Sequence, residues 1–235
     1  FGNNAAGGWL PNIVGDRPVT IRSYLALLNF KANHRKVFVA DEGGSLRAIV
    51  TSANPHDGSS RHSNLGLSFK GPAVTDLLSS ERAVLAMSGA DTGLLDHWIG
   101  RIKAEPKTEA TEAGSVALLT ESAILDQALA MINSANRGDQ LDLAMFYLSH
   151  RRIIEALTAS VERGVALRVL LDANNEAFGR EKSGIPNRPV AAELVRAGIP
   201  VRWCNTLGEQ CHTKLLMLDK KQDTTELLLG SANFT

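Results

Sequence analysis

The sequence predicts an α/β fold made of two homologous lobes, each a mixed β-sheet flanked by helices. Three observations support this prediction. Apolar stretches of strand length alternate with helical patterns along the second half of the chain. One short polar motif occurs twice, in similar surroundings. The chain of 235 residues is long enough to bury the core of one ordinary domain or of two small lobes.

Composition limits the class of protein. Apolar residues make up 44% of the chain and charged residues 21%, which is ordinary for a globular protein and excludes a disordered chain or a disulfide scaffold. The 25 basic residues balance the 25 acidic ones, so the whole chain carries no charge signal for a polyanionic partner. No stretch approaches the uninterrupted apolar length of a membrane span, and no signal peptide is visible.

Strands and helices alternate in the second lobe. Residues 122–135 carry apolar side chains at helical spacing. Ser149 is a candidate N-cap for a helix that Gly164 ends. A Val- and Leu-rich strand, a short helix, another strand and a hairpin follow. We expect strands at 141–146, 165–172, 199–203, 214–218 and 226–229, and a further helix at 189–197.

The first lobe has a similar hairpin. Its strands are expected at 36–40 and 46–50, with a turn at 41–44 between them. A strand at 64–70 and a helix from Pro72 to about Ser88 follow. The Glu-, Thr- and Ala-rich segment 104–115 is typical of a linker. The sequence therefore predicts a first lobe at 1–103, a linker at 104–115 and a second lobe at 116–235.

The two lobes differ in what surrounds the repeated motif. The second lobe has about 90 residues before its copy, whereas the first has only 33. The counterpart of the segment 122–172 is therefore missing upstream. The first lobe also continues with a strand and a helix after its copy, where the second lobe stops. We therefore expect both lobes to be incomplete, as in an internal fragment of a longer protein.

The repeated motif reads H-x-K-x4-D and is followed by S-A-N. The first copy consists of His34, Lys36, Asp41, Ser52 and Asn54. The second copy consists of His212, Lys214, Asp219, Ser231 and Asn233. The serine follows the histidine by 18 positions in the first copy and by 19 in the second. Each part alone is common, but two copies with matching spacing indicate a shared function.

Strand geometry places the histidine and the lysine of each copy together. Residues two apart on a strand project from the same face. The residues after each lysine are apolar on both faces, which predicts a central strand covered on both sides. The histidine and the lysine then lie at the mouth of this strand. Asp41 and Asp219 close the strands at the turn.

The two copies resemble the HKD motifs of the phospholipase D superfamily. The resemblance implies two lobes related by a pseudo-two-fold axis, whose motifs meet to form one active site. It also implies cleavage of a phosphodiester through a covalent phosphohistidine, without a metal or another cofactor. By this resemblance the catalytic residues are His34, Lys36, Asp41, His212, Lys214 and Asp219.

The residue types suit this chemistry. Two lysines can bind the non-bridging oxygens of a phosphodiester and offset charge in the transition state. Hydrogen bonds to the same oxygens are expected from Ser52, Asn54, Ser231 and Asn233. One neutral imidazole can attack phosphorus, and the other, when protonated, can give its proton to the leaving oxygen.

The resemblance also suggests which residue has which role. The first motif of the superfamily usually supplies the nucleophile, so we expect His34 to attack and His212 to act as general acid and base, with the reverse assignment open. Many members carry an acid after S-x-N that orients a histidine. Asp57 is the candidate here, and Glu209 is a weaker one. Thr51 departs from the glycine that often precedes the serine, whereas Gly230 keeps it.

Two further groups of residues lie near the second motif. Cys204 and Cys211 could pair or stay free, and with His212 they are too few for a zinc site. A basic rim for a phosphate group is conceivable, although loop and helix-start cations are more often simply solvated. Its members are Arg151, Arg152, Arg180, Lys182 and Arg188.

The sequence favours a bacterial lipid enzyme, either a phospholipase D or a phosphatidyltransferase of the cardiolipin-synthase type. The expected partner is a phospholipid or a membrane surface, and the expected location is the membrane or the cell envelope. A nuclease of the same superfamily is the alternative, disfavoured by the neutral net charge and an aromatic content of 5%. A fragment that keeps the motifs without turnover is a third possibility.

Overall fold

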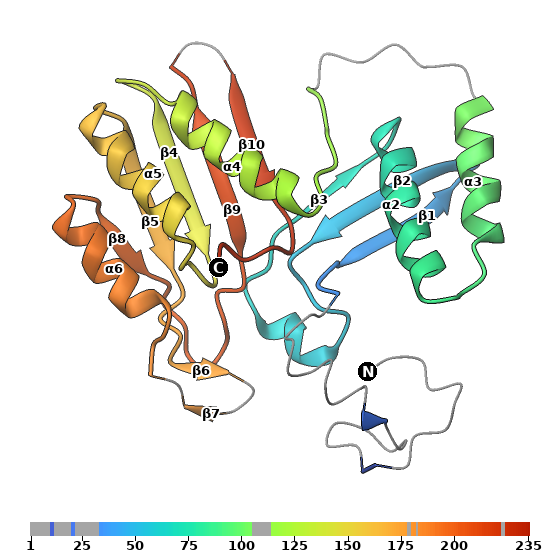
Figure 1. Ribbon diagram of the computed structural model, residues 1–235, viewed down its shortest axis with the longest axis horizontal. Helices are drawn as coiled ribbons and strands as arrows, with labels where there is room; N and C mark the ends of the chain where they lie inside the picture. The colour runs from blue at the N-terminus through green and yellow to red at the C-terminus, as the bar shows by residue number, and fades with distance from the viewer. Residues whose placement is uncertain are drawn as a thin grey trace.

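The computed structural model describes residues 10–11, 20–21, 33–104, 114–177, 180–181, 183–221 and 224–235. These residues form two main sheets, each with its own helices, side by side, and a third sheet of two short strands (Figure 1). The smaller sheet contains the first motif and the larger sheet the second. The predicted α/β class with helix-flanked sheets is confirmed.

The larger sheet has five strands in the order β10-β9-β4-β5-β8. Strands β4, β5 and β8 are parallel, whereas β9 runs antiparallel to both β4 and β10. The strands are β4 (Gln140–Met145), β5 (Ala166–Leu171), β8 (Val201–Trp203), β9 (Lys214–Asp219) and β10 (Thr225–Leu229). The carboxyl ends of the parallel strands therefore share one edge of the sheet with the start of β9.

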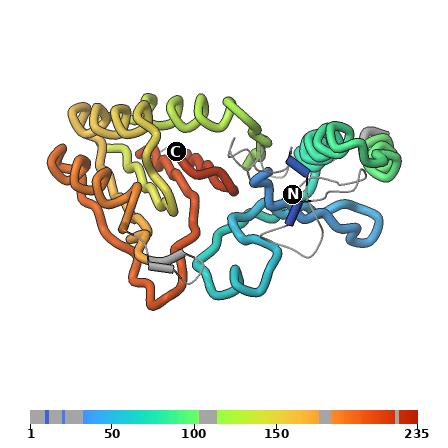
Figure 2. Tube along the Cα trace, turned by 60° about the horizontal axis from the view of Figure 1, so that its bottom comes forward, coloured from blue at the N-terminus to red at the C-terminus, as the bar shows by residue number. Residues whose placement is uncertain are grey.

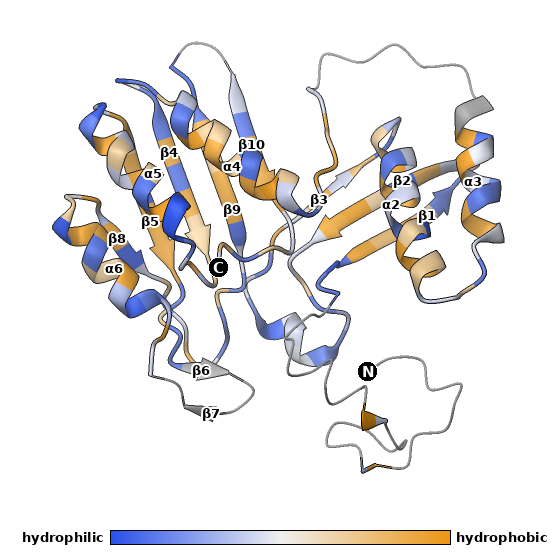
Figure 3. Cartoon of the chain, viewed as in Figure 1, coloured by the Kyte–Doolittle hydropathy of each residue, from blue (hydrophilic) through white to orange (hydrophobic). Residues whose placement is uncertain are grey.

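Three helices cover one face of this sheet as a single layer (Figures 1 and 2). They are α4 (Ser122–Ser134), α5 (Arg151–Glu162) and α6 (Asn187–Arg196). Their apolar sides pack on alternate strand residues, among them the fully buried Leu157, Leu194 and Leu216. Strand β9 is hydrophobic along its middle and hydrophilic at its ends (Figure 3). This layer is the main core of the molecule.

The second face of the larger sheet is less covered than the face on which the three helices pack. Residues of β5 alternate between exposed and buried, and Leu170 is 38% exposed. Arg168 and Asp142 form an ion pair on this open face. The sequence predicts coverage on both sides only for the two motif strands, and in β9 one face is buried while Leu215 and Met217 on the other face are partly buried.

The smaller sheet has three antiparallel strands in the order β1-β2-β3. Helices α2 and α3 pack on it, and their shared core contains the buried Val74, Leu77 and Phe69. The bounds are β1 (Val37–Glu42), β2 (Ser45–Thr51), the short 3-10 helix η1 (Asp57–Arg61), β3 (Gly66–Phe69), α2 (Ala73–Met87) and α3 (Gly93–Ala104).

Strand β1 corrects the prediction that each motif strand is central. Among the described residues it pairs with β2 alone and forms the edge of its sheet, and Phe38 is 62% exposed. Strand β9, its counterpart, lies between β4 and β10. The two strands read alike in sequence because apolar composition does not report whether a neighbouring strand is present.

The other elements lie within a few residues of their predicted positions, apart from α3 and the two-residue strands β6 (Glu176–Ala177) and β7 (Arg180–Glu181), which were not predicted. The linker prediction falls mostly on residues 105–113, which lie outside the described residues. Leu118, assigned by sequence to the second lobe, packs against the core of the first. Leu118 therefore contacts the first lobe although it follows the predicted start of the second lobe at residue 116.

Asn187 at the start of α6 is fully buried and forms hydrogen bonds with the segments that follow β4 and β5. Its side chain accepts a hydrogen bond from the Leu148 amide and donates to the carbonyls of Phe146 and Asp172. Asn187→Ala leaves these backbone groups unpaired, so we expect the free energy of unfolding to fall by about 3 kcal/mol in urea denaturation. The exposed Asn136→Ala is the matched control, and an equal loss in both variants would contradict this role.

Within the described part of the chain, no helix combines the length and the apolar character that crossing a membrane requires.

Candidate active site

The two motifs meet where the lobes touch. The His34 ring lies 3.5 Å from the Ser231 carbonyl of the other motif. In return, the His212 ring has a hydrogen bond with the backbone of Ser52. Each histidine therefore contacts the serine that belongs to the opposite motif. This reciprocal arrangement brings His34, Lys36, His212 and Lys214 into one site.

The two lysines are held in the same way. Lys36 Nζ donates a hydrogen bond to the His34 carbonyl and Lys214 Nζ to the His212 carbonyl, each over 2.9 Å. Both lysines are buried. Burial lowers the pKa of Lys36, and burial together with the Lys36 charge lowers the pKa of Lys214 to about 7. Two buried cations in one place form a site suited to negative charge.

His212 is the more enclosed of the two histidines. It is 5% exposed, and its ring packs edge-on against Phe146 with centroids 4.8 Å apart. Burial lowers the pKa of His212 to about 3, and the charges of Lys214 and Lys36 add to this effect. The imidazole of His212 is therefore neutral near pH 7 in the free protein.

His34 lies on the first motif just before β1 and is exposed. Partial burial and the nearby charge of Lys36 lower its pKa, while the hydrogen bond with the Ser231 backbone opposes that shift. A bound phosphate anion would oppose the lysine charges and bring the pKa of His34 upward. His34 is thus the more accessible of the two histidines, as a group that exchanges protons with solvent has to be.

Asn64 orients His212, and sequence reasoning missed it. Its Nδ2 donates to the carbonyls of Ser59 and His62, which directs Oδ1 toward Ser52 Oγ at 3.1 Å and His212 Nδ1 at 3.3 Å. An acceptor at this place requires the proton on Nδ1, so Nε2 keeps its lone pair. Asn64 lies outside both motifs, and the sequence analysis sought the orienting group only among acidic residues.

Replacing Asn64 tests this orientation. Asn64→Leu removes the acceptor, so we expect kcat to fall about 100-fold while the fold is retained. Asn64→Asp restores an acceptor and adds a negative charge, which is expected to raise the pKa of His212 and move the acidic limb of the kcat/KM profile to higher pH. A purely structural role for Asn64 would leave that limb where it is.

The structure places the polar residues of the S-A-N segments near the histidines. Ser52 is fully buried and its hydroxyl donates to Asn64, while Ser231 offers its carbonyl to His34. Asn54 is partly buried, and its backbone amide donates to Ser59 Oγ. Asn233 Oδ1 is buried and has no hydrogen-bond partner among the described residues. The contacts of the described residues therefore connect the two serines directly with the histidine site, and do not do so for the two asparagines.

The described contacts of the four predicted carboxylates lie away from the two histidines; Glu209, for example, accepts a hydrogen bond from the Leu207 amide. Asp41 accepts a hydrogen bond from Gly44 in the hairpin turn, and Asp219 accepts one from Thr225 at the far end of β9. Five residues separate Lys214 from Asp219, which is about 17 Å along a strand. Asp57 is exposed at the start of η1. Asp41 and Asp219 therefore hold turns at a distance from the histidines, in contrast to the catalytic role that the resemblance implies.

A loop of the second lobe forms hydrogen bonds with the first lobe. Cys204 and Cys211, whose state the sequence left open, form a disulfide that closes the loop between them. At the end of this loop the Gln210 amide donates to His62 Nδ1, and the Ser63 amide donates to the Gln210 carbonyl. Figure 1 shows the η1 segment and this loop facing one another between the lobes. The loop therefore positions Cys211 and His212 against the first lobe.

The predicted basic rim is only partly formed. Arg151 makes a bidentate ion pair with Glu193, and Arg188 donates to the Asn175 side chain. Arg152 is exposed on α5. Lys182 lies outside the described residues, as does the side chain of Arg180. In the described parts of the chain, no group of three His, Cys, Asp or Glu side chains could hold a metal ion.

Residues 128–235 match the family model described as "Cardiolipin synthase, PLD-like domain". The matched segment contains the second motif but not the first. Among curated proteins the chain has no match.

Two solved structures are similar to parts of the chain. Nuc from Salmonella typhimurium, described as a phospholipase D family member, is 25% identical with a TM-score of 0.36, and the match covers 47% of this chain and 64% of that one. NucT from Helicobacter pylori is 19% identical with a TM-score of 0.32, and the match covers 48% of this chain and 67% of that one. The chain thus spans less than two thirds of Nuc.

Proposed function

We propose that this chain is a phosphodiesterase of the phospholipase D type, in which both motifs contribute to one active site. The observation that supports this proposal best is the convergence of two histidines and two buried lysines from distant parts of the sequence. Four such groups have no mutual attraction that would explain their clustering, since the lysine charges repel one another. A bound anion offsets that repulsion.

The proposed reaction begins with His212, which reverses the assignment expected from the resemblance. A nucleophile has to be neutral and rigidly aimed, and His212 is buried, oriented by Asn64 and neutral near pH 7. Its Nε2 lone pair forms a bond to phosphorus as the bond to the leaving oxygen breaks. Protonated His34 gives its proton to that oxygen, so the first product leaves as an alcohol.

The second half of the reaction restores both histidines. Neutral His34 takes a proton from water or from an acceptor alcohol, whose oxygen attacks phosphorus. The bond between phosphorus and Nε2 breaks, and its electron pair returns to His212. Lys36 and Lys214 bind the non-bridging oxygens throughout, which stabilises the charge that develops in both transition states.

We propose a phospholipid as the substrate and a membrane surface as the place of action. A balanced net charge and an aromatic content of 5% favour a lipid over a long polyanion. A membrane-associated or cell-envelope location follows from this substrate and belongs to the same proposal.

The test compares two substrates in the presence of a chelator. One reaction holds phosphatidylglycerol vesicles with a primary alcohol, and the other holds single- and double-stranded DNA, each run with His34→Ala and His212→Ala alongside. We expect a phosphatidyl-alcohol product that both variants lose. Cleavage of DNA without cleavage of lipid would contradict the proposed phospholipid substrate and leave the proposed histidine mechanism in place. No turnover on either substrate by the full chain would contradict the proposed activity.

A further inference from the structure

A row of paired residues runs across the larger sheet from the active site on β9 to the edge strand β8. Lys214 on β9 pairs with Met145 on β4, Met145 with Leu171 on β5, and Leu171 with Trp203 on β8. These residues all lie at the edge of the sheet that carries the second motif. Neighbouring strands are about 4.8 Å apart, so the backbone of Trp203 lies about 14 Å from that of Lys214.

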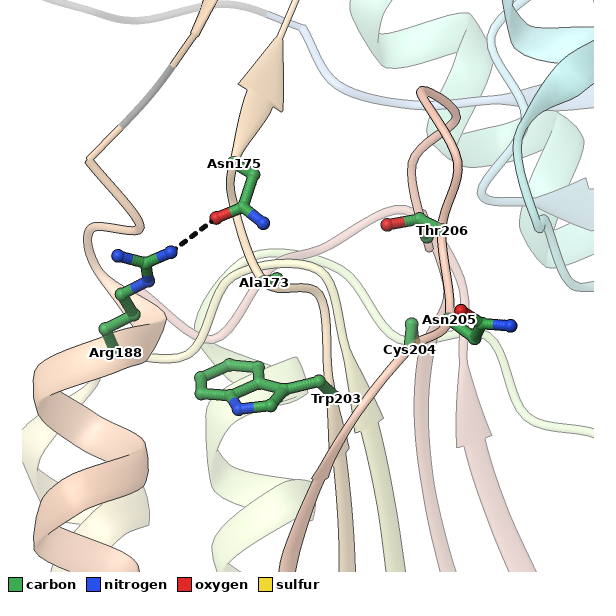
Figure 4. Close-up of a pocket in the computed structure, with 7 residues that line it drawn as sticks. All are labelled: Ala173, Asn175, Arg188, Trp203, Cys204, Asn205 and Thr206. Carbon is green, nitrogen blue, oxygen red and sulfur yellow. Dashed lines mark hydrogen bonds between the residues drawn. The ribbon is translucent and has the colours of Figure 1, made fainter.

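A polar hollow opens at this end of the row (Figure 4). It has a volume of about 540 Å³, and the indole of Trp203 forms one wall. Arg188 faces the hollow from α6 and donates a hydrogen bond of 2.7 Å to Asn175. The side chain of Arg188 is exposed. The hollow therefore contains an exposed positive charge beside an exposed aromatic ring.

An apolar groove continues from this hollow. It has a volume of about 280 Å³ and shares Arg188 and Trp203 with the polar hollow. Its α6 side consists of Ala191, Ala192 and Val195, which follow Arg188 at the helical spacing of three, four and seven residues. Its β8 side consists of Val201 and Trp203, which project from the same face of the strand. The small alanines leave the space that the groove occupies.

Large apolar side chains around this place face solvent. Ile185 is 65% exposed, Val195 56%, Trp203 45% and Leu207 89%. Ile185 precedes α6, and Leu207 belongs to the loop that the disulfide closes. Isolated exposed apolar residues are ordinary, but several of them beside an apolar groove indicate a surface that binds an apolar partner.

We propose that the hollow and the groove together bind a phospholipid, with its anionic headgroup at Arg188 and Asn175 and an acyl chain along Ala192, Val195 and Val201. The inference rests on the proposed function and extends it, because it adds a separate contact with the lipid surface beside the active site. A single strand of nucleic acid would also suit Trp203 and Arg188, but it would leave the apolar groove unfilled. Trp203 lies where the polar and apolar parts meet, as indole rings do at membrane interfaces.

Tryptophan fluorescence tests the contact without relying on turnover. The full chain is mixed with phosphatidylglycerol vesicles whose acyl chains carry bromine, which quenches only a tryptophan that touches the chains. The sequence has three tryptophans, and Trp203→Phe defines the signal that comes from the other two. We expect quenching in the unaltered protein and its loss in Trp203→Phe.

Two variants separate the polar and the apolar part. Ala192→Phe fills the groove, so we expect it to remove most of the quenching at any vesicle concentration. Arg188→Gln removes the charge, so we expect at least a 10-fold higher vesicle concentration for half-maximal quenching. Met87→Ala, which removes an exposed apolar side chain from α2 in the first lobe, is the matched control. It should change neither the extent of quenching nor the vesicle concentration for half-maximal quenching.

The outcomes distinguish this inference from the proposed activity. Quenching that depends on Trp203 in a protein without turnover supports the subsite and contradicts the activity. Turnover of lipid without such quenching supports the activity and overturns the subsite. Quenching of Trp203 by single-stranded DNA, with no effect of brominated vesicles, would also overturn the subsite as a lipid site and make it a stacking platform.

Discussion

His212→Ala is expected to abolish the covalent phosphoenzyme, whereas His34→Ala is expected to form it and release it slowly. The buried and neutral His212, held by Asn64 through Nδ1, presents Nε2 to phosphorus. Without that nitrogen there is no nucleophile, and we expect turnover to fall by at least about 10⁴-fold. Loss of His34 removes the general acid and base, which is worth about 10²- to 10⁴-fold on a lipid substrate.

A substrate with a nitrophenolate leaving group makes this difference measurable. Nitrophenolate leaves without a proton, so His34→Ala should still release one equivalent in a rapid burst and then stop, with phosphate bound to the protein. His212→Ala should show no burst and no labelled protein. His97→Ala, on the exposed side of α3, is the control and should behave as the unaltered protein. A burst in His212→Ala and none in His34→Ala would restore His34 as the nucleophile.

Lys214 is expected to set the pH dependence of the free protein. Burial, together with the Lys36 charge, lowers the pKa of Lys214 to about 7, so the ammonium group is present below this pH and lost above it. Since the cation binds the substrate phosphate, kcat/KM should fall as the pH rises through about 7. Lys214→Met should lose about 10²- to 10³-fold in kcat/KM at pH 6.

The nitrophenyl substrate isolates this group from His34, whose deprotonation would also lower activity as the pH rises. Lys214→Arg keeps its charge over the whole range, so its profile should stay flat between pH 6 and 9 even if its activity is lower. Lys70→Met, which removes a half-exposed lysine paired with Glu42, is the control for a general change in charge. A falling limb near pH 7 that persists in Lys214→Arg would exclude Lys214 as its origin.

The sequence predicted well those features that repeat or that have local causes. The paired motif located the lysines and histidines because two copies at matching distances are improbable by chance. Pro72 and Gly164 marked helix ends because their backbone preferences act within one turn. Helix α3 was missed since Gly93 and Gly100 weaken its helical pattern, and its packing against α2 comes from tertiary contacts.

Features that depend on distant partners were not predictable. Asn64 orients His212 over 148 positions of sequence, and nothing in its neighbourhood distinguishes it from a loop asparagine. The edge position of β1 depends on which strands are adjacent, not on its own residues. Asp41 and Asp219 were given catalytic roles because they belong to the motif, whereas the rise along the strand carries them away from its reactive end.

The disulfide between Cys204 and Cys211 has a consequence for how this protein can vary. One cysteine follows Trp203 and the other precedes His212, so the bond fixes both ends of the intervening loop. Substitutions at the tip, where Leu207 and Gly208 face solvent, are expected to leave the position of His212 unchanged. The loop is thus a place where the outer surface can be remodelled, by evolution or by design, while the chemistry beneath it stays unchanged.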